Sequence, residues 1–290
     1  MKIAVICPFQ NEHSRGYAQG VIEHLLERKV TVLVDSEMEH FLEDPDMASY
    51  ASVFESLPLD TDFLFCIGGD GSMLRAIMTV KDSNVPILGI NTGRLGFLTS
   101  LQKESLNVGL KQLWENKYSI INRSLLEVKL PEANEAIDSF PYALNEISVN
   151  RKNTASLISV NTRLDDEPLT TYWADGLIIS TPTGSTGYSL SSGGPIMSPQ
   201  TAGFVLTPIA PHNLNIRPLI IPNTTTIELK VTGRGEDHLL SLDSRIITVN
   251  QETRILVKKA PFTLATVELH DNAFFKTLRD KLFWGFDTRN

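Results

Sequence analysis

The first 118 residues alternate short, almost wholly apolar runs with segments of helical periodicity. The apolar runs are KIAVIC, VTVLVD, DFLFCI and PILGI, at residues 2–7, 30–35, 62–67 and 86–90. Strands that are buried on both faces read as continuous apolar runs, and parallel strands need crossovers, usually helical, between them. Helical spacing predicts helices over 17–28, 72–80 and 101–114, and an acidic helix over 37–55. We therefore expect residues 1–118 to form an α/β domain with a parallel sheet.

From residue 119 the pattern changes to strand-like runs that follow one another with turns between them. They cover residues 124–130, 143–150, 157–164, 176–180, 204–210, 218–222, 225–231, 238–242, 245–250, 254–259 and 265–269. This pattern predicts a β-rich, sandwich-like second domain over 119–270, after a Rossmann-like first domain. The segment 271–290 returns to helical spacing, and we expect it to form a C-terminal helix that packs back on the body.

Composition and charge limit the classes of protein. The chain has 290 residues, of which 42% are hydrophobic, enough for two cores. No apolar run is long enough to cross a bilayer, and the N-terminus lacks a signal-peptide pattern. The net charge of −8 argues against nucleic acid or an anionic membrane as a partner. The two cysteines, Cys7 and Cys66, are typical of reduced core residues in a cytoplasmic protein, and the six histidines show no metal-ligand spacing.

The segment CIGGDGSMLRA, residues 66–76, places one carboxylate, Asp70, among three glycines. It follows a predicted parallel strand, so it lies at the sheet edge where open α/β folds bind ligands. Glycines let backbone N–H groups approach a phosphate, and the start of the next helix favours negative charge. The alternative is a plain strand-to-helix turn in which Asp70 caps the helix.

Two further motifs lie in the β-rich part. In ALNEISV the adjacent polar residues Asn145 and Glu146 interrupt an apolar strand pattern; they indicate either a strand edge or bulge, or a pair that binds a ribose or an adenine amine. Asp175 precedes the strand GLIIS, which leads into TPTGSTGYSLSSGGP at 181–195. That uncharged segment, rich in hydroxyl groups, suits a sugar or a base, with Tyr188 as a flat surface. Its composition would also fit a flexible linker, although strands lie on both sides of it.

Taken in order, GGDG, the pair NE, DG–strand–TPTGSTGYSLSSGGP and TPIAPHNL–RP resemble the NAD kinase family over nearly the whole chain. The GGDG element is also found in diacylglycerol- and sphingosine-type lipid kinases and in phosphofructokinases. The TPTGST-type segment is more specific.

The resemblance implies an enzyme that phosphorylates the adenosine-ribose 2′-hydroxyl of NAD, forming NADP. The phosphoryl donor would be ATP, or polyphosphate in some members, with a divalent metal, usually Mg²⁺. The resemblance also implies a cytoplasmic homo-oligomer, a dimer or tetramer. Asp70 corresponds to the proton acceptor. The residues expected to bind NAD are Asp70, Gly71, Arg75, Asn145, Glu146, Asp175, Thr183, Thr186, Gly187, Tyr188, Ser189, Leu190, Ser191, Ala210 and Arg245.

Three positions depart from the family pattern. Trp173 stands where many members have arginine, Gly187 replaces the usual alanine, and Asp243–Ser244–Arg245 replaces a D-G-Q pattern. Arg245 is therefore expected to present an additional positive group. Two other hypotheses are compatible with the residues: a lipid kinase built on the GGDG domain, and a non-catalytic dinucleotide sensor.

Overall fold

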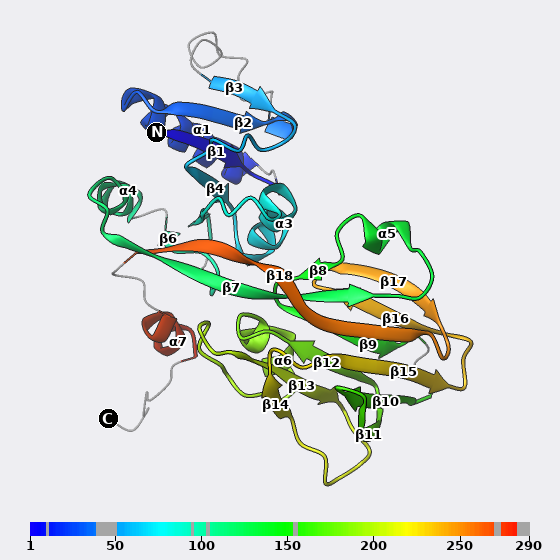
Figure 1. The fold of residues 1–290 in the computed structure, drawn as a ribbon. Coiled ribbons are helices and arrows are strands. Elements are labelled where there is room, and N and C mark those ends of the chain that lie inside the picture. Colours follow the sequence, from blue (N-terminus) through cyan, green and yellow to red (C-terminus); the bar gives the residue numbers. More distant parts are fainter. Residues whose placement is uncertain are drawn as a thin grey trace, which may run out of the picture. The chain divides into compact units, whose positions relative to one another are not determined.

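The computed structural model describes residues 1–9, 12–38, 51–93, 96–102, 105–152, 156–269 and 274–282. The chain divides into two compact units (Figure 1): unit 1 contains Met1–Asn122 and Leu264–Asn290, and unit 2 contains Arg123–Thr263. Two long strands, β7 (Tyr118–Lys129) and β18 (Arg254–Leu269), carry the chain between them. Each unit has its own core of buried apolar side chains.

Unit 1 contains a parallel sheet in the order β3-β2-β1-β4-β5-β18, with β6 also paired to β5. Its other strands are β1 (Lys2–Ile6), β2 (Thr31–Asp35), β3 (Ala51–Phe54), β4 (Phe63–Ile67), β5 (Ile87–Asn91) and β6 (Leu101–Gln102). Its helices are α1 (Glu12–Glu27), α3 (Asp70–Val80), α4 (Leu106–Trp114) and α7 (Phe274–Leu282). The α/β prediction for this part is confirmed.

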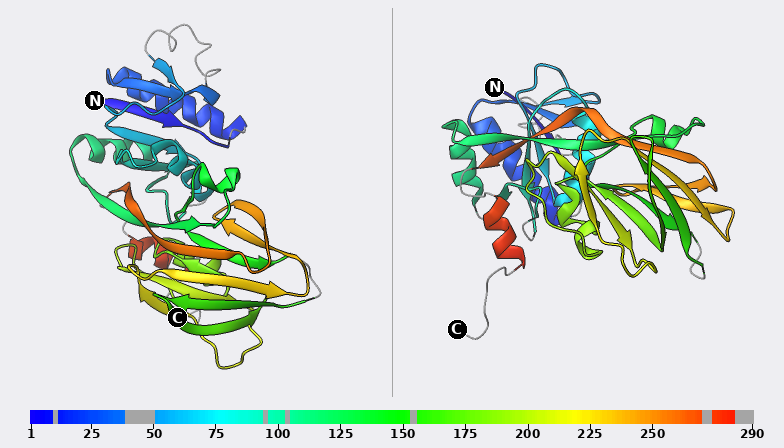
Figure 2. Two further views of the ribbon diagram at one scale, coloured as in Figure 1. Left: turned by 45° about the vertical axis from the view of Figure 1, so that its right-hand side comes forward. Right: turned by 60° about the horizontal axis from the view of Figure 1, so that its bottom comes forward.

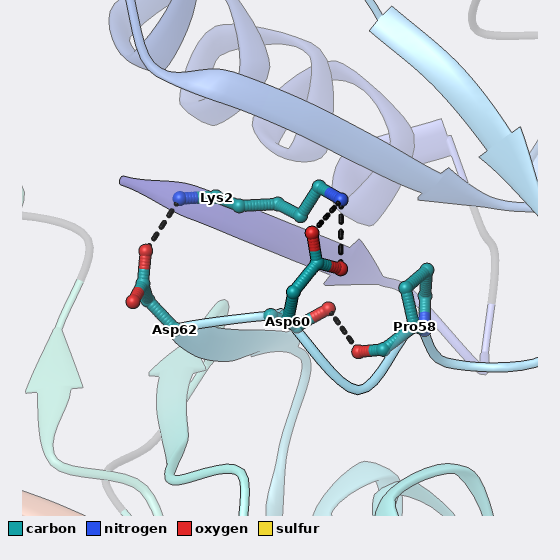
Figure 3. A network of polar contacts seen from close by, with 5 residues as sticks. Lys2, Pro58, Asp60 and Asp62 are labelled. Carbon is teal, nitrogen blue, oxygen red and sulfur yellow. Dashed lines mark hydrogen bonds and ion pairs between the residues drawn. The ribbon is translucent and has the colours of Figure 1, made fainter.

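The central strands of this sheet are buried on both faces, as their apolar sequences require. Every residue of β4 and β5 is buried. Side chains from α1 and α4 share one core with alternate residues of β1, β2, β4 and β5. Figure 2 shows α1 lying beside the strands β1 and β2. On the N-terminal side of β4, the backbone N–H of Lys2 donates to Asp62 at 2.7 Å, and its ammonium group lies 2.7 Å from Asp60 (Figure 3). These contacts tie the turn before β4 to the start of β1.

Unit 2 contains two antiparallel sheets. One has the order β11-β10-β15-β18, with β7 beside β18 and β8 beside β7; the other has the order β14-β13-β12-β9-β16-β17. The core of the unit takes side chains from both sheets, which is the sandwich-like arrangement predicted. Its strands besides β7 and β18 are β8 (Tyr142–Ala143), β9 (Glu146–Arg151), β10 (Ile158–Leu164), β11 (Glu167–Ala174), β12 (Gly176–Ser180), β13 (Gly203–Ile209), β14 (Leu219–Pro222), β15 (Ile227–Gly233), β16 (Asp237–Leu242) and β17 (Arg245–Asn250). Its short helices are α5 (Glu135–Asp138), the 3₁₀ turn η3 (Gly184–Thr186) and α6 (Tyr188–Ser191).

Four local predictions were wrong. Residues 51–54 form the edge strand β3 and not the end of an acidic helix, because they pair in parallel with β2; residues 39–50 of that predicted helix lie outside the described part. Leu101 belongs to β6, so the following helix starts later, at Leu106. The runs at 254–259 and 265–269 form one strand, β18. Finally, the sequence did not predict β11, because its first four residues are exposed and show no apolar pattern.

Candidate active site

The GGDG segment of unit 1 is a tight turn from β4 into α3. Gly68 adopts φ +141°, a conformation that L side chains rarely adopt, so the turn requires glycine here. The N-cap residue of α3 is Gly69, and Asp70 is the first helical residue, two residues earlier than predicted. Asp70 therefore lies at the carboxyl end of a parallel strand and is half-buried.

The carboxylate of Asp70 is bound by the loop that follows β5. The backbone N–H groups of Phe97 and Leu98 donate to its two oxygens at 2.9 and 3.1 Å. Gly96 allows this approach, because a Cβ atom at that position would lie 1.7 Å from Oδ1 of Asp70. The hypothesis that Asp70 serves only as a helix cap is wrong, since both of these partners lie in another loop. The glycine-rich composition of the loop, NTGRLGFLTS, was its only signal in the sequence.

Gly71 and Arg75 lie on the first turns of α3, next to an aromatic residue that the sequence did not single out. The guanidinium carbon of Arg75 lies 4.8 Å from the ring centroid of Phe9, in the segment after β1. A Cβ atom on Gly71 would lie 3.7 Å from the same ring. Phe9 is 51% exposed, so this cation–π pair borders solvent beside the Asp70 turn.

In unit 2, Asn145 and Glu146 lie where the predicted strand over 143–150 is interrupted, at the start of the inner strand β9 and not at a sheet edge. Asn145 lies between β8 and β9, and Glu146 begins β9. The carboxylate of Asp243 accepts hydrogen bonds from the backbone N–H groups of Leu144, Asn145 and Glu146 at 2.9, 2.8 and 3.1 Å. Asp243 lies about a hundred residues away in the turn between β16 and β17, so sequence spacing could not reveal this support.

Glu146 is half-buried, and its buried Oε2 atom has no hydrogen-bond partner within the described residues. Burial and the nearby charge of Asp243 raise the pKa of Glu146 to about 8. A carboxyl group in this state is available to donors from a ligand. Gly187 lies against it, because a Cβ atom there would be 3.3 Å from Oε2.

The segment Thr183–Ser191 folds as η3 and α6 within unit 2, so it is not a linker. It is joined to the Asn145 turn by the N–H of Thr181, which donates to the Asn145 carbonyl oxygen at 2.9 Å. Several of its hydroxyl groups already have protein partners: Ser185 and Thr186 donate to the carbonyl oxygens of Pro182 and Thr183 at 2.6 and 3.2 Å, and the Ser189 hydroxyl lies 2.8 Å from that of Thr207.

The remaining members of the segment differ in burial and partners. Thr183 is buried, and its hydroxyl accepts a hydrogen bond from the buried Arg123. Thr186, Gly187 and Leu190 are half-buried, while Tyr188 and Ser191 are exposed. The ring of Tyr188 is therefore an exposed aromatic surface on this segment.

Asp175 and Ala210 lie at the opposite end of β12 from the Glu146 cluster. Ser180 pairs with Glu146 at one end of the strand, whereas Gly176 pairs with Ile209 at the other. A five-residue strand is about 17 Å long, so these two sets are separate. Asp175 forms an ion pair with Arg151 at 3.0 Å.

Arg245 and Trp173, two of the positions that depart from the family pattern, both have defined contacts. The guanidinium group of Arg245 donates to the carbonyl oxygens of Phe140 and Tyr142, and its carbon lies 5.2 Å from the Phe140 ring centroid. The expected extra positive group is thus bound to backbone next to the Asp243 turn. Trp173 is 56% exposed, and its backbone N–H donates to Oδ1 of Asn213 at 2.9 Å.

Both cysteines are buried and free, as predicted. Within the described ranges, no three His, Cys, Asp or Glu side chains converge in a way that could hold a metal ion. None of the described helices combines the length and apolarity needed to cross a membrane.

Comparison with known proteins gives consistent results for both units. The model of the ATP-NAD kinase N-terminal domain matches residues 3–118, and that of the ATP-NAD kinase C-terminal domain matches residues 144–269. NAD kinases of Christiangramia forsetii and Flavobacterium psychrophilum are 49% and 47% identical to this chain, each over 100% of both chains.

Two solved structures are similar throughout. Yeast NADH kinase complexed with NADH has a TM-score of 0.85 at 26% identity, covering 99% of this chain and 89% of that one. An NAD kinase from Archaeoglobus fulgidus in complex with ATP has a TM-score of 0.75 at 27% identity, covering 98% of this chain and 99% of that one. These comparisons do not support the lipid-kinase or sensor hypotheses. The chain belongs to the ATP-NAD kinase family.

Proposed function

We propose that this protein transfers the γ-phosphoryl group of ATP to the adenosine-ribose 2′-hydroxyl of NAD, with Asp70 as the proton acceptor. The observation that carries the proposal is the position of the Asp70 carboxylate. It stands at the carboxyl end of β4, among glycines, and is oriented by two backbone N–H groups. Family membership supports the same reaction.

The step requires an acceptor oxygen in line with the phosphoryl group and a group that takes the acceptor proton. The 2′-oxygen forms a bond to the γ-phosphorus while the bond from that phosphorus to the β–γ bridging oxygen breaks. ADP leaves, and the hydroxyl proton passes to the Asp70 carboxylate. Because a ribose hydroxyl is a weak acid, a positioned base contributes a factor of about 10² to 10⁴. Glycines beside Asp70 leave room for both substrates.

In unit 2, we assign NAD binding to the cluster of Asn145, Glu146, Tyr188 and the half-buried positions Thr186, Gly187 and Leu190. Glu146 and Asn145 supply hydrogen-bonding groups on a turn fixed by Asp243. Tyr188 supplies an exposed ring, and Ser191 an exposed hydroxyl. Thr183 and Ser189 support the segment from inside, while Asp175, Ala210 and Arg245 remain predicted contacts.

A divalent cation would arrive with ATP, since no three His, Cys, Asp or Glu side chains among the described residues could hold a metal ion. Mg²⁺ commonly takes several of its ligands from substrate phosphates, so the ATP phosphates would hold it and Asp70 would stay the proton acceptor. When bound, the ion neutralises charge on the β- and γ-phosphates. Gly71 and Arg75, next to Asp70, are the residues that we assign to the nucleotide side of this region.

We expect a cytoplasmic homo-oligomer with NAD and ATP as substrates and no nucleic-acid or membrane partner. Sedimentation velocity of the purified protein tests whether its oligomeric state is a dimer or a tetramer. The activity is tested by incubating the protein with NAD or NADH and with ATP or polyphosphate, and measuring the phosphorylated dinucleotide. Formation of NADP supports the proposal. Tight NAD binding without turnover would favour the sensor hypothesis, and phosphorylation of a lipid alone would favour the lipid kinase.

A further inference from the structure

We infer that helix α7 positions the Asp70 base by holding the side chain of Phe97, whose backbone N–H group binds the Asp70 carboxylate. This inference rests on the proposed function, because it assigns α7 a part in orienting the proposed base. Every residue involved belongs to unit 1. Phe274 and Lys281 are thus positioning residues, which act on the reaction only through Phe97 and Asp70.

The first link joins Asp70 to the loop after β5. Its two carboxylate oxygens accept from the consecutive N–H groups of Phe97 and Leu98, and Gly96 packs directly against them. Because these two donors come from backbone, the direction of the carboxylate depends on the conformation of residues 96–98. Leu98 is buried, whereas the Phe97 side chain is only half-buried. The ring of Phe97 therefore needs contacts from another element to keep its place.

The second link joins Phe97 to both ends of α7, the helix drawn in red in Figure 1. The rings of Phe97 and Phe274 have centroids 6.4 Å apart and are tilted by 48°. The ammonium group of Lys281 lies 4.7 Å from the centroid of the Phe97 ring. An aromatic pair and a cation–π contact thus hold one ring from two positions on the same helix.

The third link attaches α7 itself to the sheet. The backbone N–H of Phe274 donates to the carboxylate of Glu268, near the end of β18, at 3.0 Å. Thr277 and Leu278 are buried, whereas the neighbouring Phe275 is 61% exposed. Helix α7 therefore contacts Phe97 of the loop after β5 through the face that carries Phe274 and Lys281.

Loosening these contacts would let the 96–98 backbone move and the Asp70 carboxylate turn away from its productive direction. Small displacements of a reacting group cost rate rather than ground-state affinity when the group acts only in the transition state. We expect Phe274→Ala and Lys281→Met each to lower kcat about tenfold and to leave the KM for NAD within about threefold. Lys281→Arg keeps a cation over the ring and should retain most of the turnover.

The matched controls lie on the same helix. Arg279→Gln and Asp280→Asn each remove an exposed charge; both should stay within about twofold of the wild-type kcat, whereas Phe275 is no neutral control because its ring lies 5.5 Å from that of Phe274. Phe274→Leu retains most of the volume and provides a second variant should Phe274→Ala unfold. Thermal unfolding of each variant separates loss of fold from loss of turnover.

The decisive experiment combines Phe274→Ala or Lys281→Met with Asp70→Asn and measures kcat of each double variant. Since α7 acts through Asp70, neither added change should lower kcat below that of Asp70→Asn alone. Equal losses with and without Asp70→Asn, or wild-type kcat in folded Phe274→Ala, would overturn the inference. Wild-type turnover in Asp70→Asn alone would instead overturn the proposed base, so the two failures are distinguishable.

Discussion

The carboxylate of Asp243 lies 2.8 Å from the backbone nitrogen of Asn145, a residue 98 positions earlier in the chain. With the N–H groups of Leu144 and Glu146 bound to the same carboxylate, this contact sets the turn that presents Glu146. Hydrogen bonds to a charged acceptor are among the stronger ones in proteins.

Asp243→Ala removes the acceptor of three backbone N–H groups whose hydrogen bonds are partly buried. We expect the free energy of unfolding to fall by about 2 to 4 kcal/mol, because donors that lose their partner away from solvent are costly. The KM for NAD should rise at least tenfold where the variant folds. Chemical denaturation and initial-rate kinetics measure the two effects, with Asp237→Ala, which removes the half-buried partner of Lys152, as the control. Unchanged NAD affinity in Asp243→Ala would contradict the role of this turn in binding.

Glu146 should release a proton when NAD binds. Its pKa of about 8 means that the free protein carries the protonated acid at pH 7. Hydrogen-bond donors of a ligand favour the carboxylate and lower the pKa, so binding expels part of a proton. Calorimetric titrations with NAD at pH 7, in buffers that differ in ionisation enthalpy, measure this release. It should vanish in Glu146→Gln; an equal release in that variant would assign the proton to another group.

Asp175→Asn is expected to raise the KM for NAD about tenfold with kcat within about threefold. Asp175 is paired with Arg151 at the far end of β12 from Glu146, so the two sites do not share partners. The effects of Asp175→Asn and Glu146→Gln on NAD affinity should therefore add. Arg151→Gln, which removes the ion pair and keeps the carboxylate, is the matched control. A loss of turnover as deep as that of an Asp70 variant, with KM unchanged, would contradict a binding role.

His238 should make the protein less stable in acid. It is 1% exposed, both ring nitrogens lack partners within the described residues, and burial lowers its pKa to about 4. Between pH 6.5 and pH 4 the unfolded chain binds a proton that the folded chain does not, so stability falls as pH falls. The upper limit is about 3 kcal/mol over this window, at 1.36 kcal/mol per pH unit.

Urea denaturation at a series of pH values tests this. We expect His238→Leu to flatten the slope between pH 4 and pH 6.5, while a variant of His212, on the exposed turn after β13, keeps it. A slope that is identical in wild type and His238→Leu would assign the acid sensitivity to other groups.

Both architectures could be predicted from the sequence because buried strands have recognisable local patterns of apolar residues. The continuous apolar runs of β4 and β5 predicted the parallel sheet, and the successive strand-like runs after residue 118 predicted the sandwich. By contrast, β3 and β11 are exposed over much of their length, so pairing with a neighbour, and not residue type, makes them strands.

The candidate site could be predicted only where its residues form a motif within a short stretch of the sequence. The GGDG turn and the Asn145–Glu146 pair stand out as polar or glycine residues in apolar surroundings. Their supports, Asp243 and the loop that binds Asp70, are distant in sequence, and no local pattern links them to the residues that they hold. Likewise, the buried hydroxyl groups of Ser185 and Ser189 look the same in the sequence as exposed ones.

The most direct test of the account is the turnover of Asp70→Asn with saturating NAD and Mg²⁺–ATP, paired with NAD affinity by calorimetry. Asparagine keeps the size of the side chain but cannot accept the ribose proton. We predict that kcat falls by about 10² or more while the dissociation constant for NAD stays within a few-fold. Near-wild-type turnover, or recovery of the rate when Mn²⁺ replaces Mg²⁺, would contradict the assignment of Asp70 as the base.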